Sequence, residues 1–162
     1  MESYNHQLDW YHESQISKKL VNYFELNNYK IIKNNSENIS ARGADLIVCS
    51  NSEYLVIEVK GYPTTFHTKG VNKGLPKPTK PKLQAKHWFS EAIFSSIYNY
   101  SRYKDSQNLI IAIAFPLNER YKELIKKVED YFTDNDLNFR VYFVDENGSV
   151  LLDNLNKLER NK

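Results

Sequence analysis

The chain has 162 residues, of which 41% are hydrophobic and 26% are charged, and its formal net charge is +2. This length suits one domain with a substantial core, and the composition excludes an intrinsically disordered chain. The single cysteine, Cys49, excludes an internal disulfide and a multi-cysteine zinc site. Because no segment approaches the roughly 18 apolar residues of a membrane span, we expect a cytoplasmic protein that forms one domain over residues 1–162.

The first part of the chain contains patterns for one helix followed by three strands. Apolar residues recur at four-residue spacing over 8–27 and predict a helix, and YKIIK at 29–33 predicts a short strand. The polar stretch 34–43 is expected to be a loop. The apolar runs 44–50 and 54–61 are separated by the turn-forming residues NSE, which predicts a β-hairpin.

The second part begins with a long irregular loop. Residues 61–81 hold four of the five prolines and three of the five glycines in the chain. A helix is expected over 82–103, a buried strand over 108–116, an amphipathic helix over 118–134 and a strand–turn–strand unit over 139–152.

The order of these elements predicts an α/β protein. An early hairpin followed by a strand–helix–strand crossover requires a mixed sheet, with helices packed against it. The long helix is expected to face the sheet with the apolar residues that recur every fourth position, which are Ala85, Phe89, Ile93 and Ile97.

Three charged residues meet at one end of the predicted hairpin. Asp45 lies near the start of its first strand, and Glu58 and Lys60 lie near the end of the second. Antiparallel pairing places these two ends side by side, and Glu58 and Lys60 share a face because strand side chains alternate. Two carboxylates can hold a hard divalent cation such as Mg²⁺. A lysine beside them can orient or deprotonate a water molecule, or offset the charge of a transition state.

The sequence GAD at 43–45, followed by EVK at 58–60, resembles the motif of the PD-(D/E)XK nuclease superfamily. Ala44 replaces the proline that usually precedes the aspartate. The resemblance implies a three-layer α/β/α restriction-endonuclease-like fold and a Mg²⁺-dependent endonuclease, with Mn²⁺ as a substitute, that hydrolyses DNA phosphodiester bonds. It implies Asp45, Glu58 and the carbonyl of Val59 as metal ligands, and Lys60 as the group that positions the attacking water. The family usually acts on double strands as dimers, which implies a homodimer.

Two further residues fit the resemblance by their placement. Glu13 lies three positions before Ile16 on the apolar stripe of the first helix, and in the family an acid from that helix often completes the metal site. Gln84 lies in the first turn of the helix after the long loop, where a family glutamine supports the lysine or contacts the substrate. Both are therefore candidate catalytic residues beside Asp45, Glu58 and Lys60.

The stretch from Val59 to Ser90 contains no aspartate or glutamate. Its seven lysines give one segment of a nearly neutral chain a strongly positive charge, which is typical of a surface that binds nucleic-acid phosphates. The predicted DNA-binding residues are the lysines that follow Lys60, namely Lys69, Lys73, Lys77, Lys80, Lys82 and Lys86.

Simpler interpretations stay open at this point. Asp45, Glu58 and Lys60 also fit a solvated strand face with a cross-strand salt bridge. Glu13 also fits an acid that complements the helix dipole, and Gln84 an ordinary surface residue. The alternative functions are a catalytically inactive nucleic-acid-binding module that retains the nuclease fold, and an interaction subunit whose basic loop binds an acidic partner.

Overall fold

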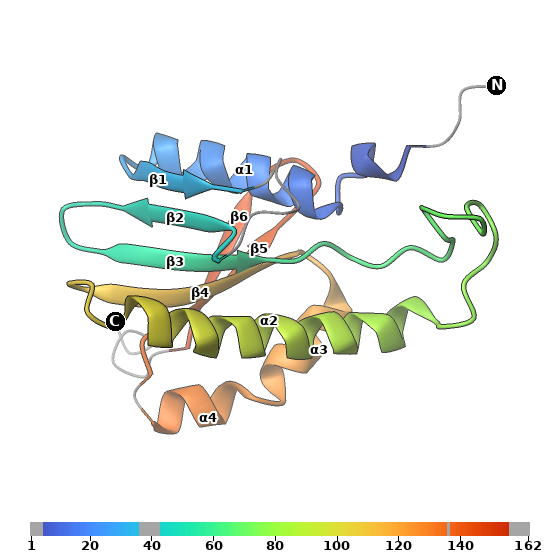
Figure 1. Cartoon of the computed structure of the whole chain (residues 1–162). Helices are drawn as coiled ribbons and strands as arrows, with labels where there is room; N and C mark the ends of the chain where they lie inside the picture. The colour runs from blue at the N-terminus through green and yellow to red at the C-terminus, as the bar shows by residue number, and fades with distance from the viewer. Residues whose placement is uncertain (1–4, 36–42, 136, 156–162) are drawn as a thin grey trace.

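The fold is known from a computed structural model, which describes residues 5–35, 43–135 and 137–155 (Figure 1). These residues form a single six-stranded sheet in which the spatial order of the strands follows the chain. The strands are β1 (Lys30–Asn34), β2 (Leu46–Cys49), β3 (Tyr54–Val59), β4 (Leu109–Pro116), β5 (Phe139–Val144) and β6 (Val150–Asn154).

The pairing of the strands confirms the mixed sheet. Strand β2 pairs antiparallel with both β1 and β3, strands β3, β4 and β5 pair parallel with one another, and β6 returns antiparallel to β5. The parallel strands lie in the middle of the sheet and are almost entirely buried, as expected for strands covered on both faces.

Helices cover both faces of this sheet, so the three-layer α/β/α prediction is confirmed (Figure 1). On one face lies α1 (Glu13–Leu26), which follows the short 3₁₀ turn η1 (His6–Leu8). On the other face lie α2 (Pro81–Tyr103), α3 (Glu119–Lys126) and α4 (Glu129–Asp134). Within the described part of the chain, no helix combines the length and the apolar character that crossing a membrane requires.

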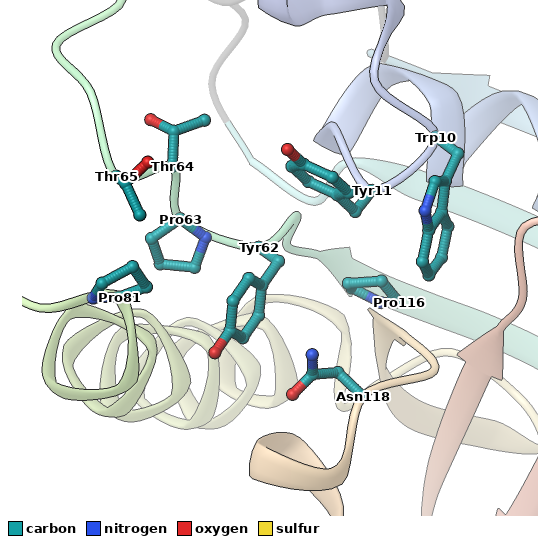
Figure 2. A pocket seen from close by; sticks show the side chains of 9 residues that line it. All are labelled: Trp10, Tyr11, Tyr62, Pro63, Thr64, Thr65, Pro81, Pro116 and Asn118. Atoms are coloured by element: carbon teal, nitrogen blue, oxygen red, sulfur yellow. The ribbon is translucent and has the colours of Figure 1, made fainter.

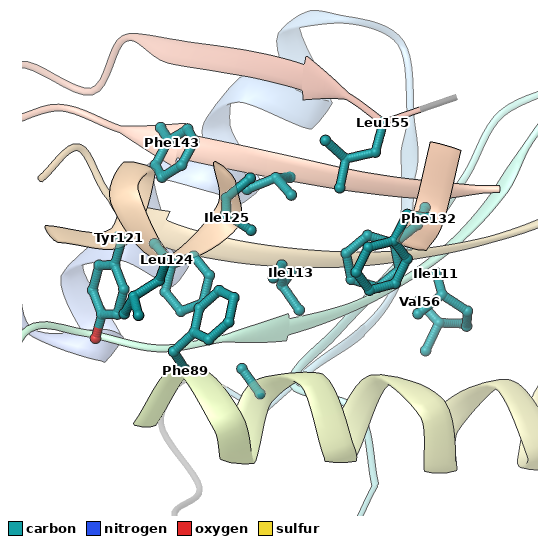
Figure 3. Close-up of a cluster of buried hydrophobic side chains, with 14 of the residues drawn as sticks. Val56, Phe89, Ile111, Ile113, Tyr121, Leu124, Ile125, Phe132, Phe143 and Leu155 are labelled. Carbon is teal, nitrogen blue, oxygen red and sulfur yellow. The ribbon is translucent and has the colours of Figure 1, made fainter. Parts of the chain in front are cut away.

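Each face of the sheet has its own apolar core. Ile16, Leu20 and Phe24 of α1 pack against strand residues such as Ile57 and Ala112. On the opposite face, α2, α3 and α4 pack on the alternate residues of the same strands (Figure 3). The labelled core residues there include Val56, Phe89, Ile113, Leu124 and Phe132.

The first predicted helix begins later than expected. Residues 8–27 were predicted as helical, but α1 starts at Glu13, and Leu8 is 75% exposed in η1. The imidazole of His12 accepts a hydrogen bond from the amide of Ser14 and so caps the first turn. The four-residue stripe therefore identified the buried face of the helix from Ile16 onward but extended it too far.

The remaining differences concern two helices. The segment 118–134 forms two helices because the chain leaves helical geometry at Val128 (φ −122°, ψ −6°). In α2, Ala85 and Phe89 are buried as predicted, but Ile97 is 59% exposed. Four-residue steps rotate about 40° around a helix of 3.6 residues per turn, so a long series at this spacing leaves the buried face. Ser96 takes the buried position instead.

Candidate functional site

The predicted pair of carboxylates lies on one face of the β2–β3 hairpin. Leu46 pairs with Ile57, so the antiparallel register brings Asp45 opposite Glu58 one step further on. Residues directly opposite each other in such a pair project from the same face. Oδ2 of Asp45 accepts a hydrogen bond from the amide of Val59 at 2.8 Å, which fixes this carboxylate beside the end of β3.

Lys60 stands between two carboxylates that come from different elements. Its Nζ lies 3.1 Å from Oε1 of Glu58 and 3.7 Å from Oε1 of Glu91, a residue of α2. The Glu58 side chain is only 9% exposed, whereas that of Glu91 is 62% exposed. Lys60 therefore forms a short ion pair with the buried carboxylate of Glu58 and a longer one with the exposed carboxylate of Glu91.

Glu13 joins this cluster because the start of α1 packs against the end of β3. A Cβ on Gly61 would lie only 2.7 Å from the amide nitrogen of Glu13, so the absence of a side chain at residue 61 permits the contact. The amide of Tyr62 donates to the carbonyl of Tyr11 at 2.9 Å and holds the two segments together. Glu13 lies in the first turn of α1, where the residue as a whole is exposed while its carboxyl group is partly desolvated among the acids of the cluster.

The electrostatics of the cluster follow from burial and from the repulsion among its acids. Burial, and then repulsion by Asp45, raise the pKa of Glu58 to about 7. Burial also raises the pKa of Asp45, against the hydrogen bond from Val59. The pKa of Glu13 is raised by desolvation and by its proximity to Asp45. Removal from water and crowding of like charges both disfavour ionised carboxylates, so this site favours a bound cation.

For Lys60, the neighbouring carboxylates favour the charged form. Burial alone would lower its pKa, but Glu58 and Glu13 outweigh burial and raise the pKa above the ordinary value for lysine. In this arrangement the side chain is an ammonium ion at neutral pH. It therefore suits charge compensation and orientation better than proton abstraction.

The donor set at the hairpin fits a hard divalent cation in its chemistry. Asp45 and Glu58 provide two carboxylates, and the carbonyl of Val59 faces the same neighbouring strand as its amide because both groups of a strand residue point to one side. No set of three or more His, Cys, Asp or Glu side chains is arranged as a metal site in the described ranges. Two carboxylates and a carbonyl are a number of protein ligands that suits Mg²⁺, which usually keeps several waters.

Helix α2 contributes residues that the sequence patterns did not single out. Glu91 contacts Lys60, and the hydroxyl of Ser95 interacts with the carboxyl of Glu58. These residues lie seven and eleven positions after Gln84, so all three share one helix face. The sequence offered two signals for these residues. They share a helix face with Gln84, and Glu91 is the first acid after the lysine-rich stretch.

Gln84 itself lies at a distance from the acidic cluster. It precedes Glu91 by two turns of α2, which corresponds to about 10 Å along the helix axis. Its Oε1 accepts a hydrogen bond from Nζ of Lys77 at 3.5 Å. The structure therefore joins Gln84 to the lysine-bearing segment rather than to Asp45, Glu58 and Lys60.

The lysine-bearing segment runs from the end of β3 to the start of α2 and extends past the start of α1 (Figure 1). Apart from an isolated bridge between Phe66 and Pro76, it is irregular, as predicted. Lys77 is half-buried, and burial lowers its pKa. The other predicted DNA-binding lysines are exposed, namely Lys69, Lys73, Lys80, Lys82 and Lys86.

The fold of this chain resembles that of a XisH family protein from Nostoc punctiforme. The two structures align with a TM-score of 0.50 and 18% sequence identity, over 86% of this chain and 95% of the other. No protein-family model matches the sequence, and no curated protein matches it. At this identity the likeness concerns the fold alone.

Proposed function

We propose that this protein is a metal-dependent endonuclease of the PD-(D/E)XK superfamily that hydrolyses DNA phosphodiester bonds. The observation that carries the proposal is the convergence of Asp45, Glu58 and Lys60 on one face at the end of β3. A solvated strand face would not bury Glu58 to 7% exposure or raise its pKa to about 7. The crowding of acids around one lysine is costly in the folded protein, and such strain is frequent at catalytic sites.

Each residue of the cluster has a distinct role in this proposal. Asp45, Glu58 and the Val59 carbonyl would hold Mg²⁺, or Mn²⁺ in its place. The bound cation would activate a water molecule and stabilise charge on the scissile phosphate. Lys60 orients that water as an ammonium ion, and Glu91 keeps the ammonium in place from the side of α2.

Glu13 and the lysine-bearing segment act at the edges of the site. Glu13 adds a carboxylate at the start of α1, where it can accept a hydrogen bond from a water molecule in the cluster. The exposed lysines between β3 and α2 bind backbone phosphates on either side of the cleaved bond, which makes binding dependent on salt. We propose a homodimer for cleavage of both strands of a duplex.

The decisive experiment compares metal binding and cleavage in matched variants. Asp45→Asn and Lys60→Met are compared with Asp105→Asn and Lys104→Met, whose exposed side chains lie beyond the far end of α2. We expect wild type to cut DNA with Mg²⁺ or Mn²⁺ but not with EDTA, and both site variants to lose cleavage.

A second measurement separates metal binding from activity. Mg²⁺ should raise the melting temperature of wild type and of both controls, but not that of Asp45→Asn, because a ligand stabilises the state that binds it. DNA binding that persists without any metal-dependent cleavage or stabilisation would overturn the nuclease proposal. That result would favour the alternative of a catalytically inactive nucleic-acid-binding module.

A further inference from the structure

A pocket of about 370 Å³ is lined by Pro116 at the end of β4 and by residues that follow β3 shortly after Lys60 (Figure 2). Its walls carry three aromatic rings, from Trp10, Tyr11 and Tyr62. The rest of the lining is dominated by proline, with Pro63, Pro81 and Pro116. Figure 2 shows that the aromatic rings come from two segments, the chain just before α1, which carries Trp10 and Tyr11, and the chain after β3, which carries Tyr62.

The rings are held in place by contacts outside the pocket. Nζ of Lys19 lies 5.3 Å from the centroid of the Trp10 ring, a cation–π contact that fixes the indole. Tyr62 packs edge-on against Tyr121 at 5.7 Å, and its amide donates to the carbonyl of Tyr11. A rigid aromatic wall of this kind loses little conformational entropy when it stacks on a planar ligand.

The polar groups of the pocket are few and uncharged. Besides the polar groups of the three aromatic rings, they are the hydroxyls of Thr64 and Thr65 and the side-chain amide of Asn118. The hydroxyl of Thr64 donates to the carbonyl of Phe66, and the side-chain oxygen of Asn118 accepts from the amide of Arg120. A small lining of hydroxyls and an amide among rings suits the edge of a heterocycle, which offers both donors and acceptors. A charged ligand group would find no opposite charge inside this pocket.

Charged groups instead line an adjoining cavity of about 520 Å³, which shares Tyr62 and Asn118 with the pocket and carries three basic and two acidic side chains. Arg120 and Lys122 of this second cavity are paired with Glu123 and Glu119. We therefore assign Lys82, the remaining basic residue of the second cavity, to the binding of a phosphate. The two cavities together place an aromatic, uncharged site next to a site with one net positive charge, and a nucleotide likewise joins an apolar base to a charged phosphate.

We propose that the pocket of Trp10, Tyr11 and Tyr62 takes one unpaired nucleobase of a DNA strand, with Lys82 on its phosphate. The identity of the ligand as DNA rests on the proposed function. Tyr62 is separated from Lys60 by Gly61 alone, and Tyr11 is two residues before Glu13. A base held here therefore places its own strand at the acidic cluster. The preferred substrate is DNA with an unstacked nucleotide beside the cleaved bond.

The test compares two DNA duplexes that differ by one base. One carries a single bulged adenine, and the other has the same bulge as an abasic nucleotide, so charge and length are identical. Binding is measured in EDTA by the anisotropy of a labelled strand. We expect loss of the base to weaken wild-type binding about 5- to 150-fold, the range for stacking of one base on aromatic side chains.

Variants then locate the effect. Trp10→Leu should weaken binding to the bulged adenine but not to the abasic bulge, and Trp88→Phe, a replacement outside the pocket, should behave as wild type. In the Trp88→Phe background Trp10 is the single tryptophan, and its fluorescence should be quenched by the bulged adenine and not by the abasic duplex. The wild-type comparison stands even if a variant fails to fold.

Two outcomes would overturn the pocket proposal, and neither depends on cleavage. Equal wild-type affinity for both duplexes would overturn it, as would a preference for the base that Trp10→Leu leaves unchanged in a folded protein. Base-dependent binding without cleavage in Mg²⁺ would leave the pocket in place and count against the nuclease. Metal-dependent cleavage without any base-dependent binding would support the nuclease proposal and overturn the pocket proposal.

Discussion

The backbone of Gly61 lies against that of Glu13 so closely that a methyl group on Gly61 would stand 2.7 Å from the Glu13 nitrogen. The same methyl group would lie 2.6 Å from the carbonyl oxygen of Tyr11. On its other side, the carbonyl of Gly61 accepts a hydrogen bond from the hydroxyl of Tyr121 at 2.7 Å. One glycine thus fixes the start of α1 and a residue of α3 to the end of β3, and so sets Glu13 beside Lys60.

Gly61→Ala should therefore both destabilise the protein and disturb the site. Because the clashing atoms are backbone, the start of α1 must move, and we expect a loss of roughly 1 to 3 kcal/mol in the free energy of unfolding. Urea denaturation measures this loss, with Gln107→Ala, an exposed replacement, as the control expected to stay within about 0.5 kcal/mol. An unchanged free energy of unfolding in Gly61→Ala would contradict the close packing.

Glu58→Gln should change stability in a pH-dependent way. Folding raises the pKa of this carboxyl from 4.5 to about 7, so the folded protein is penalised when the group ionises as the pH rises above 4.5. We expect the variant to be more stable than wild type at pH 8 by roughly 1 to 3 kcal/mol, and nearly equal at pH 4. Denaturation at both pH values tests this, and Glu25→Gln on the exposed face of α1 should show no such difference.

Glu91→Gln should affect activity with little effect on stability. The exposed carboxylate contributes little to folding, but it lies 3.7 Å from Nζ of Lys60 and holds the ammonium from the side of α2. If the proposed function holds, we expect kcat to fall about tenfold while KM changes little, because the residue positions Lys60 without binding DNA. Equal reductions in kcat for Glu91→Gln and the control Glu25→Gln would argue against this role.

Glu53 and Arg140 form an ion pair at the opposite end of the sheet. The guanidinium donates to both carboxylate oxygens at 2.6 and 2.8 Å, and these hydrogen bonds lower the pKa of Glu53. Because Arg140 is buried, Glu53→Gln should cost roughly 3 to 5 kcal/mol at pH 7. A carboxyl with a lowered pKa loses its contribution as the pH falls through that pKa, so the cost should shrink below pH 4. A cost that stays the same at pH 3 and pH 7 would be inconsistent with the ion pair.

The exposed lysines between β3 and α2 should determine how DNA binding depends on salt. Each lysine that neutralises a phosphate contributes about 0.9 to the slope of log affinity against log salt concentration. We expect Lys69→Gln and Lys73→Gln each to reduce the slope by about that amount, with Lys104→Gln at the far end of α2 as the control. Slopes that do not differ from wild type in either variant would show that these lysines do not contact phosphates.

Hydrophobic patterns predicted most of the fold because they report burial directly. The apolar runs of β2, β3 and β4 and the stripe of Ile16, Leu20 and Phe24 correspond to buried residues. Element ends were less accurate, since they depend on local groups such as the His12 cap of α1 and the non-helical backbone of Val128. Periodicity does not record such groups.

For the candidate site, residue spacing alone predicted that the three central residues share one face of the hairpin. Strand alternation and hairpin pairing are local rules, so the spacing of Asp45, Glu58 and Lys60 was enough to bring them together. The contact between Glu91 and Lys60, by contrast, depends on how α2 packs against the sheet, and this packing leaves Gln84 two helical turns before Glu91. Likewise, only the packing of α1 against Gly61 formed a pocket from Trp10, Tyr11 and Tyr62. These contacts join segments distant in the chain, and their geometry depends on how helices settle on the sheet, which no local pattern specifies.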